Sequence, residues 1–182
     1  MYILHFDGLF KTAAEIHQLP HDCGFLSYGW LIEENGQVIA HGLGTYLRRK
    51  SASSSVAEYL ALIEGLEALI DLNACHLPVS VIGDAKSVID QLEGITGVSS
   101  GDIRPLYARA SELAARFTRL HWLWTPREFN RLADALTRRA MRQLRASKKS
   151  YQQGIRSLTL NHGNPKMDDT CLMGVMVYRP AA

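Results

Sequence analysis

Residues 56–84 read VAEYLALIEGLEALIDLNACHLPVSVIGD and place a helix before a strand. Residues 56–72 consist mostly of strong helix formers, which predicts an α-helix. Residues 77–84 are short and almost wholly apolar, a pattern typical of a central strand buried on both faces. A helix that leads into such a strand indicates an α/β fold, in which helices pack on a sheet.

The flanking segments extend this alternation. Upstream we expect three strands, and the last two form a hairpin because Asn35-Gly36 is a strong hairpin turn. These strands cover residues 2–7, 24–34 and 37–47, and residues 8–23 are expected to form a loop. Downstream we expect a strand at 119–125 and helices at 85–92, 102–117 and 127–146, the last opened by Pro126. This order predicts a mixed sheet with helices packed on it.

The chain is expected to form one domain over residues 1–146, with a C-terminal tail or extension over residues 147–182. A length of 182 residues with 47% hydrophobic and 21% charged residues is typical of a globular domain with a sizeable core. From about residue 147 the composition becomes polar and irregular. The last apolar run, CLMGVMVYRP at 171–180, has two readings, an added strand or a disordered end.

Charge and cysteine content narrow the classes of protein. The net charge of +2 at pH 7 is too small to establish a nucleic-acid partner and does not exclude one. The three cysteines are widely spaced and odd in number, so they indicate neither a disulfide framework nor a zinc knuckle. We find no signal-peptide pattern, and the apolar runs are far shorter than a membrane span. We therefore expect a cytoplasmic protein with no membrane partner.

Two aspartates end predicted strands. Asp7 closes the apolar run at residues 2–6 and precedes Gly8, so it is either part of a turn or a metal ligand. Asp84 ends the apolar strand before a helix, where aspartate also serves well as an N-cap. Because chemistry in an open sheet gathers at the carboxyl ends of strands, the two side chains are candidates for one site.

Two further acids lie on predicted helices. Glu58 falls within roughly a quarter turn of Leu62 and Leu66 on a helical wheel, so it projects from the apolar face and needs a partner such as a cation. Its alternative is a first-turn glutamate favoured by the helix dipole. Asp134 lies in the last helix, where a surface pair with Arg138 is the alternative. Four carboxylates gathered together would hold Mg²⁺ or Mn²⁺ in preference to zinc.

Five pieces of the sequence resemble a type 1 ribonuclease H domain of the short, reverse-transcriptase-like kind. They follow the family's order and spacing from residue 2 to about residue 145. The pieces are FDG (6–8), SYGWLIEENG (27–36), VAEYLALIEGLEAL (56–69), GDAKSVIDQL (83–92) and WTPREFNRLADALTRRA (124–140). The resemblance implies an RNase H-like mixed five-stranded sheet, antiparallel hairpin plus parallel strands, flanked by helices.

The same resemblance implies a catalytic metal site and a substrate. The family's four acids fall on Asp7, Glu58, Asp84 and Asp134, with Asp7 bridging two Mg²⁺ or Mn²⁺ ions. The implied activity is endonucleolytic cleavage of the RNA strand of an RNA/DNA hybrid, with 5′-phosphate and 3′-hydroxyl products and no small-molecule cofactor. The alternatives are a non-enzymatic nucleic-acid-binding module on this fold and a related nuclease with another substrate. Substrate contacts are expected from Gly8, Ser54, Ser55, Arg127 and Asn130.

The sequence also departs from the family pattern. Ser54 and Ser55 stand where the family has two asparagines, and Ala85 stands where a serine follows the third acid. The family's loop histidine has no match, and residues 90–103 contain no Lys or Arg, so the protruding basic handle of some members is missing. Two readings of the basic residues at the last helix are equally open: they partly compensate for the handle by attracting a phosphate backbone, or they form a solvent-exposed helix end that complements its own dipole. These residues are Arg131, Arg138, Arg139, Arg142, Arg145, Lys148 and Lys149. Trp122 and Trp124 are expected in the core.

Overall fold

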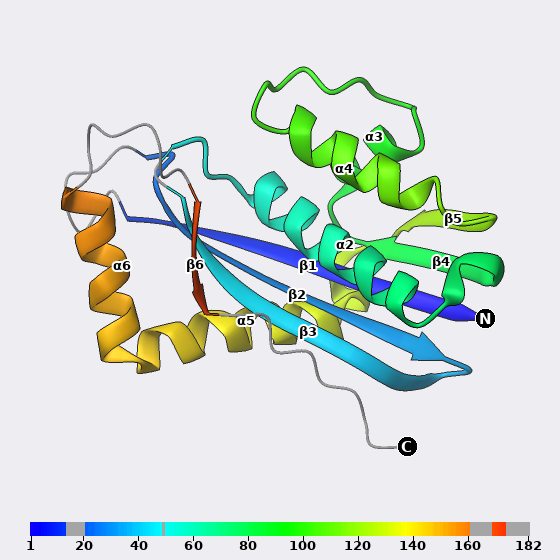
Figure 1. Cartoon of the computed structure of the whole chain (residues 1–182), viewed down its shortest axis with the longest axis horizontal. Helices are drawn as coiled ribbons and strands as arrows, with labels where there is room; N and C mark the ends of the chain where they lie inside the picture. Colours follow the sequence, from blue (N-terminus) through cyan, green and yellow to red (C-terminus); the bar gives the residue numbers. More distant parts are fainter. Residues whose placement is uncertain (14–20, 49, 161–168, 174–182) are drawn as a thin grey trace.

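A computed structural model describes residues 1–13, 21–48, 50–160 and 169–173. Within this part the chain forms one sheet in the strand order β5-β4-β1-β2-β3-β6 (Figure 1). The strands are β1 (Tyr2–Thr12), β2 (Gly24–Glu34), β3 (Gln37–Arg48), β4 (Pro78–Gly83), β5 (Arg119–Trp124) and β6 (Asp169–Met173). β1, β2 and β3 are antiparallel neighbours, whereas β4 and β5 run parallel to β1. The predicted α/β fold with a mixed sheet is confirmed, and β6 adds a sixth strand.

Helices cover both faces of this sheet (Figure 1). The helices are α2 (Ser54–Asp71), α3 (Lys86–Leu92), α4 (Arg104–Ala114), α5 (Arg131–Ala146) and α6 (Lys148–Leu160), and the 3₁₀ turns are η1 (Ala74–His76) and η2 (Arg127–Phe129). The main core lies between the sheet and α2, where Leu4 and Phe6 of β1 are fully buried with Leu62 and Leu66 of α2. α5 crosses β1, β2 and β3 on the other face.

A second, smaller core lies between α5, the start of β2 and the end of β3. Phe25, Leu47, Met141 and Leu144 are buried there. The Phe25 ring stacks on Tyr151 of α6, with ring centroids 5.1 Å apart. The start of α6 is therefore packed against the domain through this cluster.

Three sequence predictions about elements were wrong in detail. β1 extends to Thr12 instead of ending before the loop expected from residue 8, because Gly8–Thr12 stay in register with Gly24–Tyr28 of β2. The helix expected from residue 127 is split into η2 and α5 at Asn130. β4 buries alternate residues, since α5 packs mainly over β1, β2 and β3 and leaves the second face of β4 partly open.

The predicted C-terminal tail contains two elements in the described part. α6 follows α5 after Ser147, and β6 pairs antiparallel with β3, matching Tyr46 with Cys171. For the apolar run at 171–180, the structure has strand over its first three residues and does not describe residues 174–180. The domain boundary at residue 146 stays a prediction. Within the described ranges, no helix combines the length and the apolar character of a membrane span.

Candidate metal-binding active site

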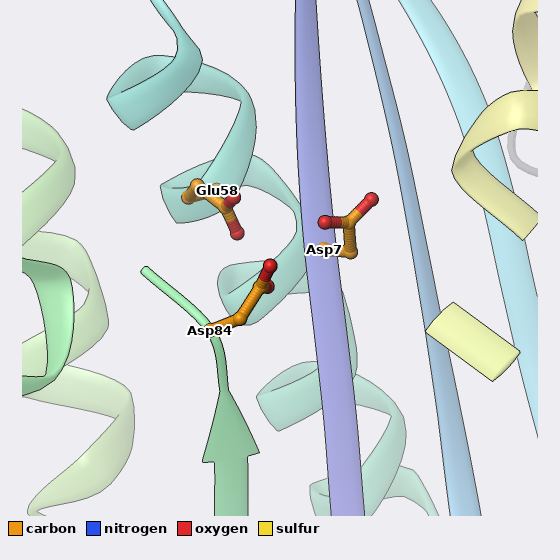
Figure 2. Close-up of side chains that lie close together, drawn as sticks. All are labelled: Asp7, Glu58 and Asp84. Carbon is orange, nitrogen blue, oxygen red and sulfur yellow. The ribbon is translucent and has the colours of Figure 1, made fainter. Parts of the chain in front are cut away.

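Three of the four predicted acids converge at one edge of the sheet. One carboxylate oxygen from each of Asp7, Glu58 and Asp84 lies within 4.8 Å of the other two. Asp7 and Asp84 directly follow Phe6 and Gly83, which are register partners in the parallel pair of β1 and β4. Figure 2 shows the three side chains projecting into one space between α2, β1 and the end of β4. We call these three residues the acidic cluster.

Glu58 reaches the cluster because α2 lies unusually close to β1. A Cβ atom at Gly8 would lie 2.2 Å from the Glu58 main-chain nitrogen and 2.3 Å from the Ala57 carbonyl carbon. Only glycine therefore fits at this point of β1. The Gly8 main-chain N–H also hydrogen-bonds the Glu58 carboxylate. The prediction that Glu58 projects from the apolar face of its helix is confirmed, since it is 7% exposed.

The α2 N-terminus is capped by a serine that we did not single out. The Ser53 hydroxyl accepts a hydrogen bond from the Val56 N–H at 3.3 Å. Ser54 is exposed and Ser55 is half-buried, and both belong to the first turn of α2, one turn before Glu58. The structure thus leaves both hydroxyls near the acidic cluster and free of the capping role, and their contact with substrate stays a prediction.

Burial and like charge oppose ionisation within the cluster. Burial, reinforced by the nearby Asp84 and Asp134 carboxylates, raises the pKa of Asp7 to about 6. Burial, followed by the proximity of Asp7 and Asp84, raises the pKa of Glu58 well above its usual value. Asp7 Oδ2 and Glu58 Oε2 are both buried and accept no hydrogen bond within the described part of the chain. Such oxygens are costly unless a cation binds them.

Without a divalent ion, the free energy of unfolding is expected to fall as the pH rises through the acidic range. The pKa of Asp7 is about 6 in the folded protein and about 3.9 in an unfolded chain. Between these two pH values the folded state therefore binds more protons than the unfolded state does. The part of the stability that depends on this protonation is lost as the pH rises through the folded-state pKa. Asp7 alone contributes about 3 kcal/mol to this fall, and Glu58 extends it to higher pH.

Urea unfolding in chelator at several pH values, for the wild type and Asp7→Asn, measures this effect. Carboxylates remote from Asp7 cancel in the difference between them, whereas Glu58, whose pKa the Asp7 charge raises, contributes with the same sign as Asp7. The stability of the wild type relative to the variant should fall as the pH rises from about 4 to about 7. A difference that does not change with pH would contradict the raised pKa of Asp7.

Asp134 lies beside the acidic cluster and is held by two arginines. Its carboxylate accepts a hydrogen bond from Arg127 Nη2 and one from Arg138 Nε, each at 2.6 Å. Burial raises the pKa of Asp134, but the hydrogen bonds from Arg127 and Arg138 outweigh burial and lower it. The surface pair with Arg138, considered as the alternative, is therefore present. The role of Asp134 as a fourth metal ligand stays a prediction.

Asn130 supports the cluster from inside the protein. It is 1% exposed, and its Nδ2 donates to the Phe6 carbonyl at 2.8 Å and to Asp84 Oδ1 at 3.0 Å. The Asp84 side chain does not cap α3, because the N-cap position falls on Ala85, which has no side-chain cap hydrogen bond. Asn130 was expected to contact substrate, and that role stays a prediction, while the structure shows it orienting Asp84.

Two residues near the cluster were missed or misjudged. The Thr137 hydroxyl lies 3.0 Å from the Asp7 carbonyl, and its proximity to the Asp7 carboxylate partly opposes the effect of burial on the pKa of Asp7. Its spacing of three residues from Asp134 could have placed it on the same helix face. Trp124 was expected in the core but is 48% exposed, and its indole N–H donates to the Asp84 carbonyl at 3.1 Å. Trp122 is partly buried against the core.

Asn130→Ala is expected to lower the free energy of unfolding by about 2–4 kcal/mol. The change leaves the buried Phe6 carbonyl without its donor and creates a cavity where α5 meets β1. Urea unfolding measures the loss, with Glu128→Ala, at an exposed neighbouring position, as the control. Equal stability of the two variants would contradict a supporting role for Asn130.

Comparisons with known proteins place this site in context. A family profile described as "Reverse transcriptase-like" matches residues 27–140. A bifunctional protein of Mycobacterium tuberculosis is 39% identical over 90 residues, which is 50% of this chain and 24% of that protein. Ribonuclease HI of Halobacterium salinarum is 34% identical over 119 residues, 65% of this chain and 57% of that enzyme. The chain thus spans about a quarter of the first relative and little more than half of the second.

Solved structures agree with these matches. The N-terminal RNase H domain of the Mycobacterium tuberculosis protein has a TM-score of 0.66 at 29% identity, covering 80% of this chain and 96% of that one. RNase H1 of Halobacterium salinarum has a TM-score of 0.66 at 30% identity, covering 78% and 98%. LC11-RNase H1, solved with an RNA/DNA hybrid, has a TM-score of 0.65 at 22% identity, covering 79% and 98%, and shares the fold.

Proposed function

The chain belongs to the reverse-transcriptase-like, type 1 ribonuclease H family, and on this premise we propose that it is a metal-dependent endoribonuclease acting on RNA/DNA hybrids. It cleaves the RNA strand and leaves 5′-phosphate and 3′-hydroxyl ends. A related structure with the same fold was solved with an RNA/DNA hybrid, which supports this choice of substrate.

The acidic cluster is the observation that carries the proposal. Asp7, Glu58 and Asp84 bring three carboxylates into one partly buried space, and two of their oxygens lack any partner among the described residues. A protein that only binds nucleic acid gains nothing from such repulsion, because like charges in a buried site oppose one another. Oxygen donors of this kind suit Mg²⁺ or Mn²⁺.

The chain's own residues have defined tasks in this scheme. Asp7, Glu58 and Asp84 would hold one ion, and Asp7 with Asp134 would hold a second. When bound, two such ions lower the pKa of a water molecule and stabilise the leaving 3′ oxygen. Asn130 keeps the Asp84 carboxylate in place, and Thr137 holds the main chain of Asp7 through its carbonyl oxygen.

Contacts to the substrate fall to residues around the cluster. Arg127, whose side chain is 59% exposed, lies within hydrogen-bond distance of Asp134. Its guanidinium can exchange this contact for one with a phosphate. The Ser54 and Ser55 hydroxyls are available to the 2′-hydroxyl groups that distinguish RNA from DNA. The main chain of Gly8, beside Glu58, is a further contact.

The proposal is tested by incubating the full-length chain with four end-labelled substrates: an RNA/DNA hybrid, duplex RNA, duplex DNA and single-stranded RNA. We expect cleavage of only the RNA strand of the hybrid, with Mg²⁺ or Mn²⁺ and not with chelator. Cleavage of another substrate alone would point to a related nuclease. Tight hybrid binding by a folded protein without turnover would favour a binding module, the alternative that Ala85 and the two serines leave open.

A further inference from the structure

A groove of about 420 Å³ leads away from the acidic site between β1 and α5. Asp7, Leu9 and Lys11 line it from β1, because alternate residues of a strand share one face. The α5 side chains along it recur at helical spacing; they are Asp134, Thr137, Arg138, Met141, Arg142 and Arg145. We call this the α5 groove. It begins at the predicted metal ligands Asp7 and Asp134 and ends at Lys11 and Arg145.

The far end of the α5 groove is strongly cationic. Lys11, Arg142 and Arg145 are exposed, and none of them forms an ion pair in the part of the chain that the structure describes. A cationic residue in the last turn of a helix is common because it complements the helix dipole, which accounts for Arg145 alone. It does not account for Lys11, which faces the helix from a strand. Cations gathered around one concavity instead favour a polyanion.

The dimensions of the groove fit several backbone phosphates. Along α5, the distance from Asp134 to Arg145 is about 16 Å at the rise of an α-helix. Along β1, the distance from Asp7 to Lys11 is about 13 Å at the rise of a strand. A groove of this length is long enough to contact more than one backbone phosphate of a single strand.

We propose that the α5 groove binds the backbone phosphates of the RNA strand next to the cleavage site. The inference rests on the proposed function, since the catalytic carboxylates define which phosphate is cut. The groove is continuous with Asp7 and Asp134, so the strand that enters it is the cleaved strand and not its complement. It supplies the positive charge that the α3–α4 region lacks, where residues 90–103 contain no Lys or Arg.

Binding of short hybrids to full-length protein carrying Asp7→Asn tests this inference without cleavage. The probes are a blunt hybrid, the same hybrid with its RNA strand extended as a single strand at one end or the other, and the same hybrid with its DNA strand extended in the same way. The variant is Arg142→Gln with Arg145→Gln. The matched control is Arg116→Gln with Arg119→Gln, which also removes two exposed arginines but lies outside the groove.

One of the two RNA extensions should tighten binding by the parent protein. The Arg142/Arg145 variant should bind that extended hybrid about tenfold more weakly than the parent does. Its salt slope, log Kd against log[NaCl], should fall by about 1.4, because each arginine that neutralises a single-strand phosphate contributes about 0.7 to the slope. The control should bind as the parent does. Equal binding of variant and parent to every probe would overturn the inference, and so would an equal loss on DNA extensions.

The two proposals fail in different ways. If the protein with Asp7 intact cuts no hybrid, while the groove variant loses affinity for the RNA extension, the nuclease proposal fails and the groove stands as an RNA-binding site. If the hybrid is cut normally and no extension changes binding, the nuclease stands and the groove inference fails.

Discussion

Asp7→Asn is expected to lower the rate of hybrid cleavage by about 10³-fold or more, a loss on the scale of removing a main electrostatic stabiliser of a reaction. Among the described residues, Asp7 is the one acid that belongs to the acidic cluster and also lines the α5 groove that contains Asp134. Asparagine keeps the shape of the side chain but removes the charge that would attract both ions. Single-turnover cleavage of an RNA-labelled hybrid in saturating Mg²⁺ measures the effect.

A second readout separates this expectation from a folding defect. In chelator, Asp7→Asn should be more stable than the wild type at neutral pH by about 1–3 kcal/mol, because it relieves repulsion from Glu58 and Asp84. Asp90→Asn is the matched control, since Asp90 pairs with Lys86 on α3 outside the cluster and should retain near wild-type activity. Reduced stability of the Asp7 variant, or full activity, would contradict the assignment.

Gly8→Ala is expected to lower the free energy of unfolding by about 2–4 kcal/mol, because overpacking against rigid main chain is not relieved by a rotamer change. The added methyl carbon would lie 2.2 Å from the Glu58 nitrogen. α2 must move away from β1, and Glu58 moves with it. Cleavage should therefore fall by about 10²-fold even in the folded fraction, as expected for a misplacement of about 1 Å.

Gly97→Ala provides the control for this change. A Cβ atom at Gly97 would meet nothing within 4 Å, so stability and activity should stay near those of the wild type. Urea unfolding gives the stability of both variants, and cleavage at a temperature where each is folded gives the activity. If Gly8→Ala is as stable as Gly97→Ala, the close approach of α2 to β1 does not constrain position 8.

The acidic cluster lowers the stability of the metal-free protein at neutral pH. The raised pKa values of Asp7 and Glu58 mean that the metal-free protein carries unfavourable charge at neutral pH. A bound cation would reverse the sign of that interaction. Mg²⁺ should accordingly raise the stability of the wild type and have little effect on that of Asp7→Asn.

Much of the fold was accessible from local patterns. Asn35-Gly36 identified the hairpin of β2 and β3, and the apolar run before Asp84 identified β4. The wheel that puts Glu58 on the apolar face of its helix located the buried carboxylate. These features depend on neighbours in the chain, because helical and strand periodicity decide which side chains share a face. The alternation of strands and helices then determined the α/β class.

Contacts between distant segments were decided only by the tertiary structure. Asn130 meets Phe6 across 124 positions in sequence, and Thr137 meets Asp7 across 130. The exposure of Trp124 was likewise decided only by packing, whereas the Arg138–Asp134 pair within α5 was an alternative that the sequence had already offered. The α5 groove also forms only because the packing of α5 on the sheet brings Lys11 of β1 opposite Arg142 of α5. Local pattern specifies the face of each element, whereas the packing of elements far apart in the chain specifies which faces meet.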